Sequence, residues 1–117
     1  MADADDCLFC RIVAGDVPAT VVRETAATLA FRDINPQAPV HVLVIPKAHH
    51  PDVAALAVAE PSLAATLVTE MTAVAEQEGL TRTGWRGVFN TGRGAGQTVF
   101  HVHGHVLGGR GMHWPPG

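Results

Sequence analysis

The chain has 117 residues, a length typical of one domain, and only 16% of them are charged. Its net charge of −3 argues against binding to nucleic acid or anionic membranes, which needs a basic surface. No stretch reaches the roughly 18–20 apolar residues of a membrane span, and the acidic residues 1–6 lack the positive charge of a signal peptide. We therefore expect a cytoplasmic, single-domain protein over residues 1–117 that is flexible over residues 1–6.

The first motif is a C-x-x-C formed by Cys7 and Cys10. A structural disulfide is not expected in a reducing compartment. Half of a metal site, a redox dithiol and two packed cysteines remain as interpretations. A thioredoxin-like dithiol should follow a strand, whereas this pair follows the acidic start of the chain. The metal half-site is therefore favoured over the redox dithiol.

Three strands are predicted in the first half of the chain. Val21–Glu24 and Thr28–Asp33 are short runs of strand-forming residues separated by turn residues. Val40–Ile45 is an apolar run typical of a central strand, although His41 lies inside it. Pro46 is expected to end this strand because proline cannot donate a backbone hydrogen bond.

The spacing of apolar residues predicts one long helix over Pro61–Glu78. Proline suits a first helical turn, and Gly79 suits the position just past the helix end. A shorter helical turn is predicted over Asp52–Leu56, with Asp52 as its cap. The apolar face of the long helix comprises Leu63, Leu67, Met71 and Val74.

The second half of the chain adds two predicted strands, Trp85–Asn90 and Val99–Leu107, on either side of a glycine-rich loop over residues 91–96. The last residues, 113–117, are too rich in proline for regular structure. Strands outnumber helices, so the sequence predicts an α+β domain with a mainly antiparallel sheet.

Three histidines alternate along the last predicted strand. Successive side chains of a strand point to opposite faces, so His101, His103 and His105 are expected on one side. A surface or packing role explains three such residues poorly. Imidazoles in this arrangement can bind metal, transfer protons or attack as nucleophiles. Two cysteines with one histidine from this cluster and one from the pair His49-His50 have the composition of a Cys₂His₂ zinc site.

Polar residues flank this cluster. The glycine-rich loop brings Asn90, Gln97 and Thr98 next to the histidines in sequence, where they can hold a phosphoryl group. Asp33 lies at the end of a predicted strand and has two interpretations. Its carboxylate can accept two hydrogen bonds from a ribose diol, or it can cap the turn before Pro36, which is favoured by spacing alone.

Several motifs together resemble the histidine triad (HIT) family, and in particular its Hint branch of purine nucleoside phosphoramidases. The resemblance runs from about Cys7 to the end of the chain, and the triad and the C-terminal tail are its most specific parts. The matching segments are FRDINPQAP (31–39), VIPKAH (44–49), GQTVF (96–100), HVHGHVL (101–107) and GGRGMHWPPG (108–117).

The resemblance implies a five-stranded antiparallel sheet with one long and one short helix, which dimerises into a continuous sheet. It also implies cleavage of nucleoside 5′-phosphoramidates to a nucleoside monophosphate and an amine. His103 is then the nucleophile that becomes nucleotidylated, and His105 contacts the phosphate oxygens. His101 orients the neighbouring ring or binds metal. No catalytic divalent metal is expected.

The resemblance also implies a purine nucleotide site. Two positions depart from the branch, which often has histidine at Arg32 and serine at Thr98. The added methyl group of Thr98 bears on leaving-group preference, and Trp114 in the tail 108–117 bears on substrate choice. The implied nucleotide-binding residues are Leu8, Phe9, Ile12, Phe31, Arg32, Asp33, Ile34, Asn90, Gly96, Gln97, Thr98, His103 and His105, with Thr98 also placed beside the reacting phosphate.

A structural zinc is implied as well, bound by Cys7, Cys10, His49 and His101. His49 is preferred to His50 because it fits the family spacing after Pro46-Lys47. Three further functions remain open: a non-catalytic nucleotide-binding regulatory dimer, a dinucleoside polyphosphate hydrolase and a nucleotidyl transferase. The transferases typically end their motif with glutamine where this chain has His105, and the Hint-like tail argues against the polyphosphate hydrolases.

Overall fold

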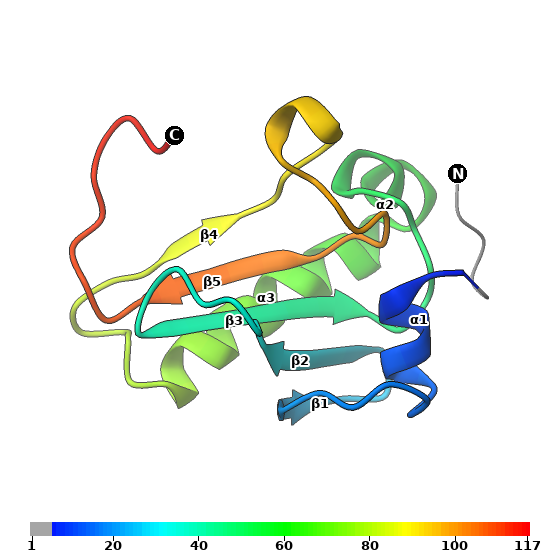
Figure 1. Ribbon diagram of the computed structural model, residues 1–117, viewed down its shortest axis with the longest axis horizontal. Coiled ribbons are helices and arrows are strands. Elements are labelled where there is room, and N and C mark those ends of the chain that lie inside the picture. The colour runs from blue at the N-terminus through cyan, green and yellow to red at the C-terminus, as the bar shows by residue number, and fades with distance from the viewer. Residues whose placement is uncertain (1–5) are drawn as a thin grey trace.

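A five-stranded antiparallel sheet in the order β1-β2-β3-β5-β4 forms the frame of the protein in a computed structural model that describes residues 6–117 (Figure 1). This confirms the predicted α+β class. The expected flexible segment 1–6 lies outside the described residues except for Asp6. The strands are β1 (Val21–Glu24), β2 (Thr28–Arg32), β3 (Val40–Pro46), β4 (Arg86–Val88) and β5 (Gly104–Gly108).

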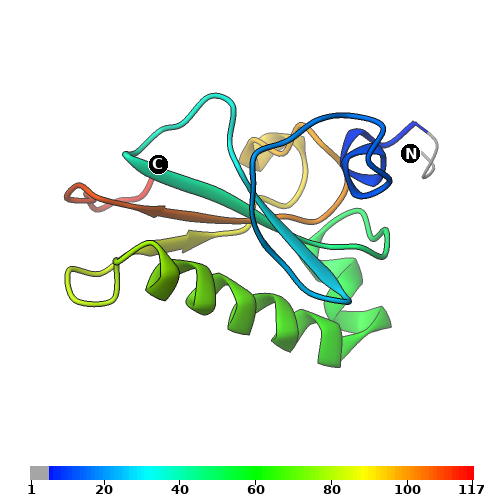
Figure 2. The same ribbon diagram turned by 90° about the horizontal axis from the view of Figure 1, so that it is seen from below.

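The central strand β3 separates two apolar layers. Val42 and Val44 pack in the cluster on the face covered by the long helix. Leu43 and Ile45, which alternate with them, pack in a second cluster that contains Phe9. Figure 2 shows the long helix on one side of the sheet and the N-terminal helix on the other. Because both faces are covered, nearly every side chain of β3 is buried, as its apolar run predicts.

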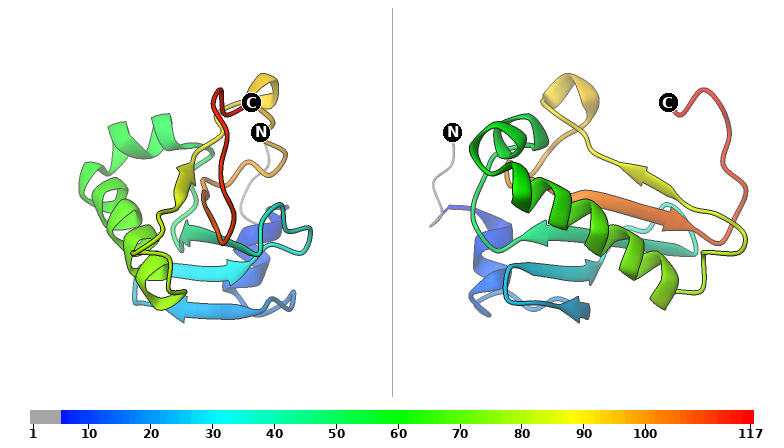
Figure 3. Two further views of the ribbon diagram at one scale, coloured as in Figure 1. Left: turned by 90° about the vertical axis from the view of Figure 1, so that its left-hand side faces the viewer. Right: turned by 180° about the vertical axis from the view of Figure 1, so that it is seen from behind.

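Two of the three helices match the predictions. Helix α3 (Pro61–Gln77) begins with proline, and Gly79 beyond its end has a φ of 77°. Helix α2 (Val53–Ala59) begins after Asp52, whose carboxylate accepts a hydrogen bond of 2.8 Å from the backbone N–H of Ala55. Figure 3 shows both helices on the same side of the sheet.

The N-terminal helix α1 (Leu8–Val13) was not predicted, so the expectation of only one short helix is wrong. It has six residues, too few for a stable isolated helix. Its N-cap is Cys7, whose sulfur accepts the N–H of Cys10 at 3.4 Å. The sulfurs of the two cysteines also contact distant histidine rings. Tertiary contacts therefore stabilise this helix.

Strand β5 begins at Gly104, so the prediction of a strand from Val99 is wrong for its first residues. Its pairing with β3 ends at Val44 opposite Gly104. Two residues further along β3, the carbonyl of Pro46 accepts a hydrogen bond from the ring Nε2–H of His101 at 2.8 Å. Proline offers no N–H and its carbonyl is already bound, so the ladder cannot continue. Strand β4 is also shorter than predicted and ends at Val88 opposite His105.

The C-terminal residues after β5 form no regular secondary structure, as predicted. Arg86 of β4 donates a hydrogen bond of 2.9 Å to the carbonyl of His113, which holds this segment beside the sheet edge. Trp114 follows and is exposed. Among residues 6–117, no helix is both long and apolar enough to cross a membrane.

Candidate active site

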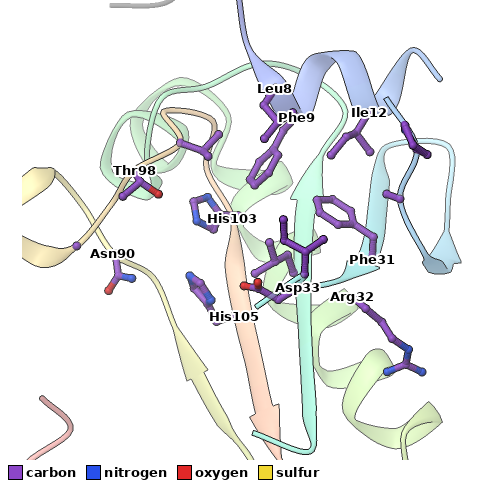
Figure 4. Close-up of a pocket in the computed structure, with 16 residues that line it drawn as sticks. Leu8, Phe9, Ile12, Phe31, Arg32, Asp33, Asn90, Thr98, His103 and His105 are labelled. Atoms are coloured by element: carbon purple, nitrogen blue, oxygen red, sulfur yellow. The ribbon is translucent and has the colours of Figure 1, made fainter. Parts of the chain in front are cut away.

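A cavity of about 300 Å³ lies on the face of the sheet that carries α1 (Figure 4). It brings together every predicted nucleotide-binding residue except Gln97. It also includes Pro18, Ala19, Leu43 and Val99, which were not predicted. The predicted residues that line it are Leu8, Phe9, Ile12, Phe31, Arg32, Asp33, Ile34, Asn90, Gly96, Thr98, His103 and His105.

His103 is held with one ring nitrogen free. Its Nδ1 lies 2.8 Å from the carbonyl oxygen of His101. A carbonyl only accepts, so Nδ1 carries the proton and Nε2 carries the lone pair. Phe9 meets the ring edge-on, with centroids 5.1 Å apart. Burial lowers the pKa of His103, although the His101 carbonyl and Asp33 oppose this effect. The ring is therefore neutral at pH 7, with its nucleophilic nitrogen unprotonated.

His105 has the opposite tautomer because of His41. The backbone N–H of Gln37 donates to Nδ1 of His41 at 3.0 Å, so the proton of neutral His41 is on Nε2. That nitrogen lies 2.9 Å from Nδ1 of His105 and donates to it. His105 consequently carries its own proton on Nε2. The hydrogen bond from His41 therefore makes His105 a hydrogen-bond donor through Nε2.

The charge of His105 is suppressed as well. Burial lowers its pKa to about 4, with smaller contributions from the nearby rings of His103 and His41, while Asp33 opposes the shift. Burial also lowers the pKa of His41, again opposed by Asp33. The cluster at pH 7 therefore consists of three neutral rings whose proton positions are set by fixed backbone groups.

Asp33 caps the predicted turn and also reaches the cavity. Its Oδ1 accepts a hydrogen bond of 2.9 Å from the backbone N–H of Asn35, which is the predicted turn cap. Its Oδ2 lies 3.4 Å from Nε2 of His41. The carboxylate also lines the cavity. Asp33 therefore joins the turn after β2 to the histidine cluster.

The cavity has an apolar end and a polar end. Figure 4 shows Ile12 and Phe31 on one side of His103, and Asn90 and Thr98 on the other. Ile34 is fully exposed at the apolar end, so a planar apolar ligand can cover it. Arg32 also lines this end, but its guanidinium is ion-paired with Glu78 at 2.6 Å. The cavity thus suits a ligand with an apolar ring at one end and an anionic group at the other.

Gln97 was predicted to contact the nucleotide, but its side chain is directed into the protein and is only 2% exposed. Its Nε2 donates to the carbonyls of Pro51 at 2.7 Å and Val99 at 3.0 Å. Its Oε1 accepts the N–H of Gly92 at 2.9 Å. Gln97 therefore ties the glycine-rich loop to the segment after β3, and Thr98, next in sequence, reaches the cavity.

A separate cluster joins Cys7, Cys10, His49 and His101. Their four candidate ligand atoms all lie within 4.8 Å of one another. Nδ1 of His101 is 3.4 Å from each sulfur and 3.3 Å from Nδ1 of His49. Ligands on a tetrahedral zinc ion are separated by roughly 3.3–3.8 Å. Both the donor set and the spacing therefore fit a four-coordinate zinc ion.

The proton positions in this cluster agree with metal binding. Nε2 of His101 donates to the Pro46 carbonyl, so Nδ1 presents its lone pair to the sulfurs. Burial lowers the pKa of His101 to about 4. His50 is excluded from the cluster because its Nε2 pairs with Glu60 at 2.6 Å. The structure therefore places His49, not His50, beside the cysteines.

The main functional residue that sequence reasoning missed is His41. The sequence marks it only as a histidine within an apolar run. A buried polar residue in a central strand requires a partner, and that requirement was the available signal. Its partner could not be named because His105 is 64 residues away in sequence.

Comparison with known proteins gives a consistent result. The family model described as HIT domain matches residues 14–112. A 14 kDa zinc-binding protein of Zea mays is 46% identical, covering 98% of this chain and 91% of the maize protein. The purine nucleoside phosphoramidase of Escherichia coli K12 is 38% identical, covering 92% of this chain and 90% of that protein.

One solved structure shares the fold over nearly the whole length of this chain. The HIT family hydrolase from Legionella pneumophila Philadelphia 1 superposes with a TM-score of 0.92 and 49% sequence identity. The alignment covers 96% of this chain and all of the Legionella chain.

Proposed function

This chain belongs to the HIT domain family, and on that premise we propose that it is a hydrolase that cleaves nucleoside 5′-phosphoramidates to a nucleoside monophosphate and an amine. The observation that carries the proposal is the pair of opposite tautomers in one cavity. His103 has a free lone pair on Nε2, and His105 has a proton on Nε2. A nucleophile and a hydrogen-bond donor are the two groups that this reaction requires.

In the proposed reaction, Nε2 of His103 attacks phosphorus and the P–N bond breaks. The amine takes up a proton from solvent as it leaves, and the nucleotide is linked to His103; the water of the second step returns a proton to solvent. Water then attacks phosphorus, the P–Nε2 bond breaks, and His103 is regenerated. Atoms balance because one water is consumed for each phosphoramidate cleaved. Dividing the displacement into two steps uses a neutral imidazole both as nucleophile and as leaving group.

The other polar groups stabilise charge on the phosphoryl group. The Nε2–H of His105 donates to a non-bridging oxygen, and His41 keeps that proton in place. Thr98 and Asn90 line the same end of the cavity and supply further polar contacts. Such fixed donors act mainly by positioning and electrostatic stabilisation.

The nucleoside occupies the apolar end in this proposal. Phe31 and Ile34 cover the base, with Leu8 and Ile12 of α1 opposite. The carboxylate of Asp33, which lines the cavity, accepts hydrogen bonds from the ribose hydroxyls. The half-exposed Arg32 is held away by Glu78, so it forms a wall of the base site.

We also propose that Cys7, Cys10, His49 and His101 bind a structural zinc ion. The donor set fits, and the zinc-binding relative from maize supports it. These four residues would hold the ion and so would link the start of α1 to the segments that carry His49 and His101; the ion would supply a structural cross-link. Phe9 of α1 lies against the His103 ring, so fixing the position of α1 also fixes this contact.

A homodimer is proposed from the sheet edge. Among residues 6–117, β4 pairs only with β5, so its outer edge is free for strand addition. The exposed Trp114 lies in the tail held beside this strand by Arg86. Sedimentation equilibrium checks this assignment, and a monomer at micromolar concentration contradicts it.

The test of the proposed reaction compares wild type with His103→Ala on adenosine 5′-phosphoramidate. We expect turnover by wild type, loss of turnover in the variant and similar AMP affinity in both. Acid quenching followed by peptide mass spectrometry should find the nucleotide on His103.

The alternatives give different results in the same assay. If folded wild type binds AMP but cleaves nothing, the chain is a nucleotide-binding module. If it cleaves dinucleoside polyphosphates faster than phosphoramidates, the reaction class is wrong although the nucleophile stands.

A further inference from the structure

A groove continues from the cavity beneath the glycine-rich loop. It encloses about 350 Å³ and is lined by Arg93, Gly96, Gln97, Thr98 and Phe100. Gly96 and Thr98 line both the groove and the cavity. The groove therefore opens directly from the polar end of the cavity, beside the residues proposed to hold the phosphoryl group.

In the described part of the chain, the one charged side chain that lines the groove is a cation, Arg93. Arg93 is exposed, and its guanidinium carbon lies 5.8 Å from the centre of the Phe100 ring. No carboxylate lines the groove, and Arg93 has no carboxylate partner within residues 6–117. Arg32 in the cavity differs because Glu78 neutralises it. Arg93 is therefore a cation available to a ligand.

The backbone that carries Arg93 is fixed. Residues Arg93–Ala95 form a 3₁₀ turn closed by the N–H of Gly96, which donates to the Arg93 carbonyl at 3.0 Å. The preceding Gly92 makes two hydrogen bonds with Gln97. Its N–H donates to the side-chain Oε1 at 2.9 Å, and its carbonyl accepts the backbone N–H of Gln97 at 3.1 Å. The Arg93 side chain thus begins from a defined position at the rim of the groove.

The geometry of displacement assigns a role to this space. The attacking and leaving atoms lie roughly in line on opposite sides of phosphorus. In the proposed function the nucleoside fills the apolar end and His103 attacks from the floor of the cavity. The groove borders the polar end of the cavity through Gly96 and Thr98. An amine that departs on this side of phosphorus passes Arg93 and Phe100.

We propose that this groove is the leaving-group subsite and that Arg93 selects phosphoramidates whose amine carries a carboxylate, such as amino acids linked through nitrogen. Phe100 packs against the carbon chain between the amine and the carboxylate. The inference rests on the proposed function and adds the class of amine that the site prefers. Arg93 acts on binding of the leaving group and takes no part in the bond changes.

The test uses two substrates that differ by one charge, the adenosine 5′-phosphoramidates of β-alanine and of β-alaninamide. The measured quantity is the ratio of their kcat/KM values. Comparing this ratio between proteins cancels the intrinsic difference between the two leaving groups. We expect Arg93→Gln to reduce the preference for β-alanine about fivefold, the size of an exposed charge pair. Arg93→Glu should reverse the preference.

Arg82→Glu provides the matched control, because Arg82 is exposed after α3 and lines neither space. It makes the same charge change and should leave the ratio as in wild type. Raising the salt concentration to about 0.5 M should weaken the preference in wild type but not in Arg93→Gln.

The outcomes separate the subsite from the reaction itself. If wild type cleaves both substrates and Arg93→Glu leaves the ratio unchanged, the subsite is wrong and the reaction stands. An equal change in Arg82→Glu also overturns it, because the effect is then the net charge of the protein. If folded wild type cleaves neither substrate, the proposed reaction fails and the subsite fails with it.

Discussion

The backbone carbonyl of His101 accepts the Nδ1–H of His103 at 2.8 Å, while the ring of the same His101 points into the cysteine cluster. One residue therefore contributes to both sites. Its ring is positioned to bind metal, and its main chain sets which nitrogen of His103 is free. The two sites are therefore linked through alternate positions, 101 and 103, of one short motif.

Replacing His41 should impair catalysis more than binding. His41→Ala removes the donor to Nδ1 of His105, so the ring can rotate or change tautomer. We expect kcat to fall about 10- to 100-fold, with a smaller change in KM. His41→Gln retains an N–H donor and should recover part of the loss. Nitrogen NMR of the His105 ring provides the decisive readout, and an unchanged tautomer in His41→Ala would contradict the assignment.

Replacing Asp33 should remove discrimination at the ribose. Wild type should bind AMP more tightly than 2′-deoxy-AMP, by about 1.5–3 kcal/mol for a hydrogen bond to a charged group. Asp33→Asn retains an oxygen that can accept the Asn35 N–H, so the turn should survive. In this variant the two nucleotides should bind almost equally in calorimetry. Persistent discrimination shows that another group holds the 2′-hydroxyl.

Removing a cysteine should release metal and destabilise the protein. Cys7→Ser and His49→Gln should reduce zinc content measured by mass spectrometry and lower the melting temperature. His50→Gln is the matched control because its ring pairs with Glu60 outside the cluster. Equal zinc content in His49→Gln and His50→Gln rules out the assigned ligand set.

Replacing Gln97 should disturb the loop more than the base site. Gln97→Leu leaves two carbonyls and one N–H without their partner, at a cost of about 1–3 kcal/mol for each buried group. Gln97→Glu should be worse because a carboxylate then faces two carbonyl oxygens. AMP affinity should fall while adenosine affinity changes little, and equal losses for both ligands mean that the effect is global unfolding.

Stability should depend on the titration of His105. Its pKa is lowered to about 4 from an ordinary value of 6.5, and the groups around it are His103, His41 and Asp33. The unfolded chain therefore binds a proton first as the pH falls, so the free energy of unfolding decreases between about pH 6.5 and 4. His105→Asn should have a shallower slope, by at most about 1.4 kcal/mol per pH unit. If the free energy of unfolding has the same pH dependence in the two proteins, this prediction is wrong.

The sequence predicts those elements whose stability is local. Helix α3 follows from apolar spacing with proline and glycine at its ends, and β1 to β3 follow from short runs of strand formers. Helix α1 could not be found in this way because its stability comes from contacts to His49 and His101. The late start of β5 depends on Pro46, which is distant in sequence.

The same distinction applies to the candidate site. Motif resemblance identified residues that the structure brings to one cavity, from Leu8 to His105. It also assigned Gln97 to the ligand, although its hydrogen bonds go to the backbone of three other residues. Motif spacing states which residue types recur, whereas the direction of a side chain depends on the backbone groups around it. His41 was missed for the same reason.

The cluster that joins Cys7 to His101 spans 94 positions of the chain. Closing such a long loop has a large entropic cost, and the short helix α1 does not form by itself. A nascent chain emerging from the ribosome can thus form α3 and the first three strands early, and Phe9 of α1 can pack against Phe31 of β2 at that stage. The sulfurs of Cys7 and Cys10 meet the ring of His101 only after residue 101 has emerged. Chains truncated before residue 101 lack His101, His103 and His105, so neither the cysteine cluster nor the histidine cluster in the cavity can form until these residues have been synthesised.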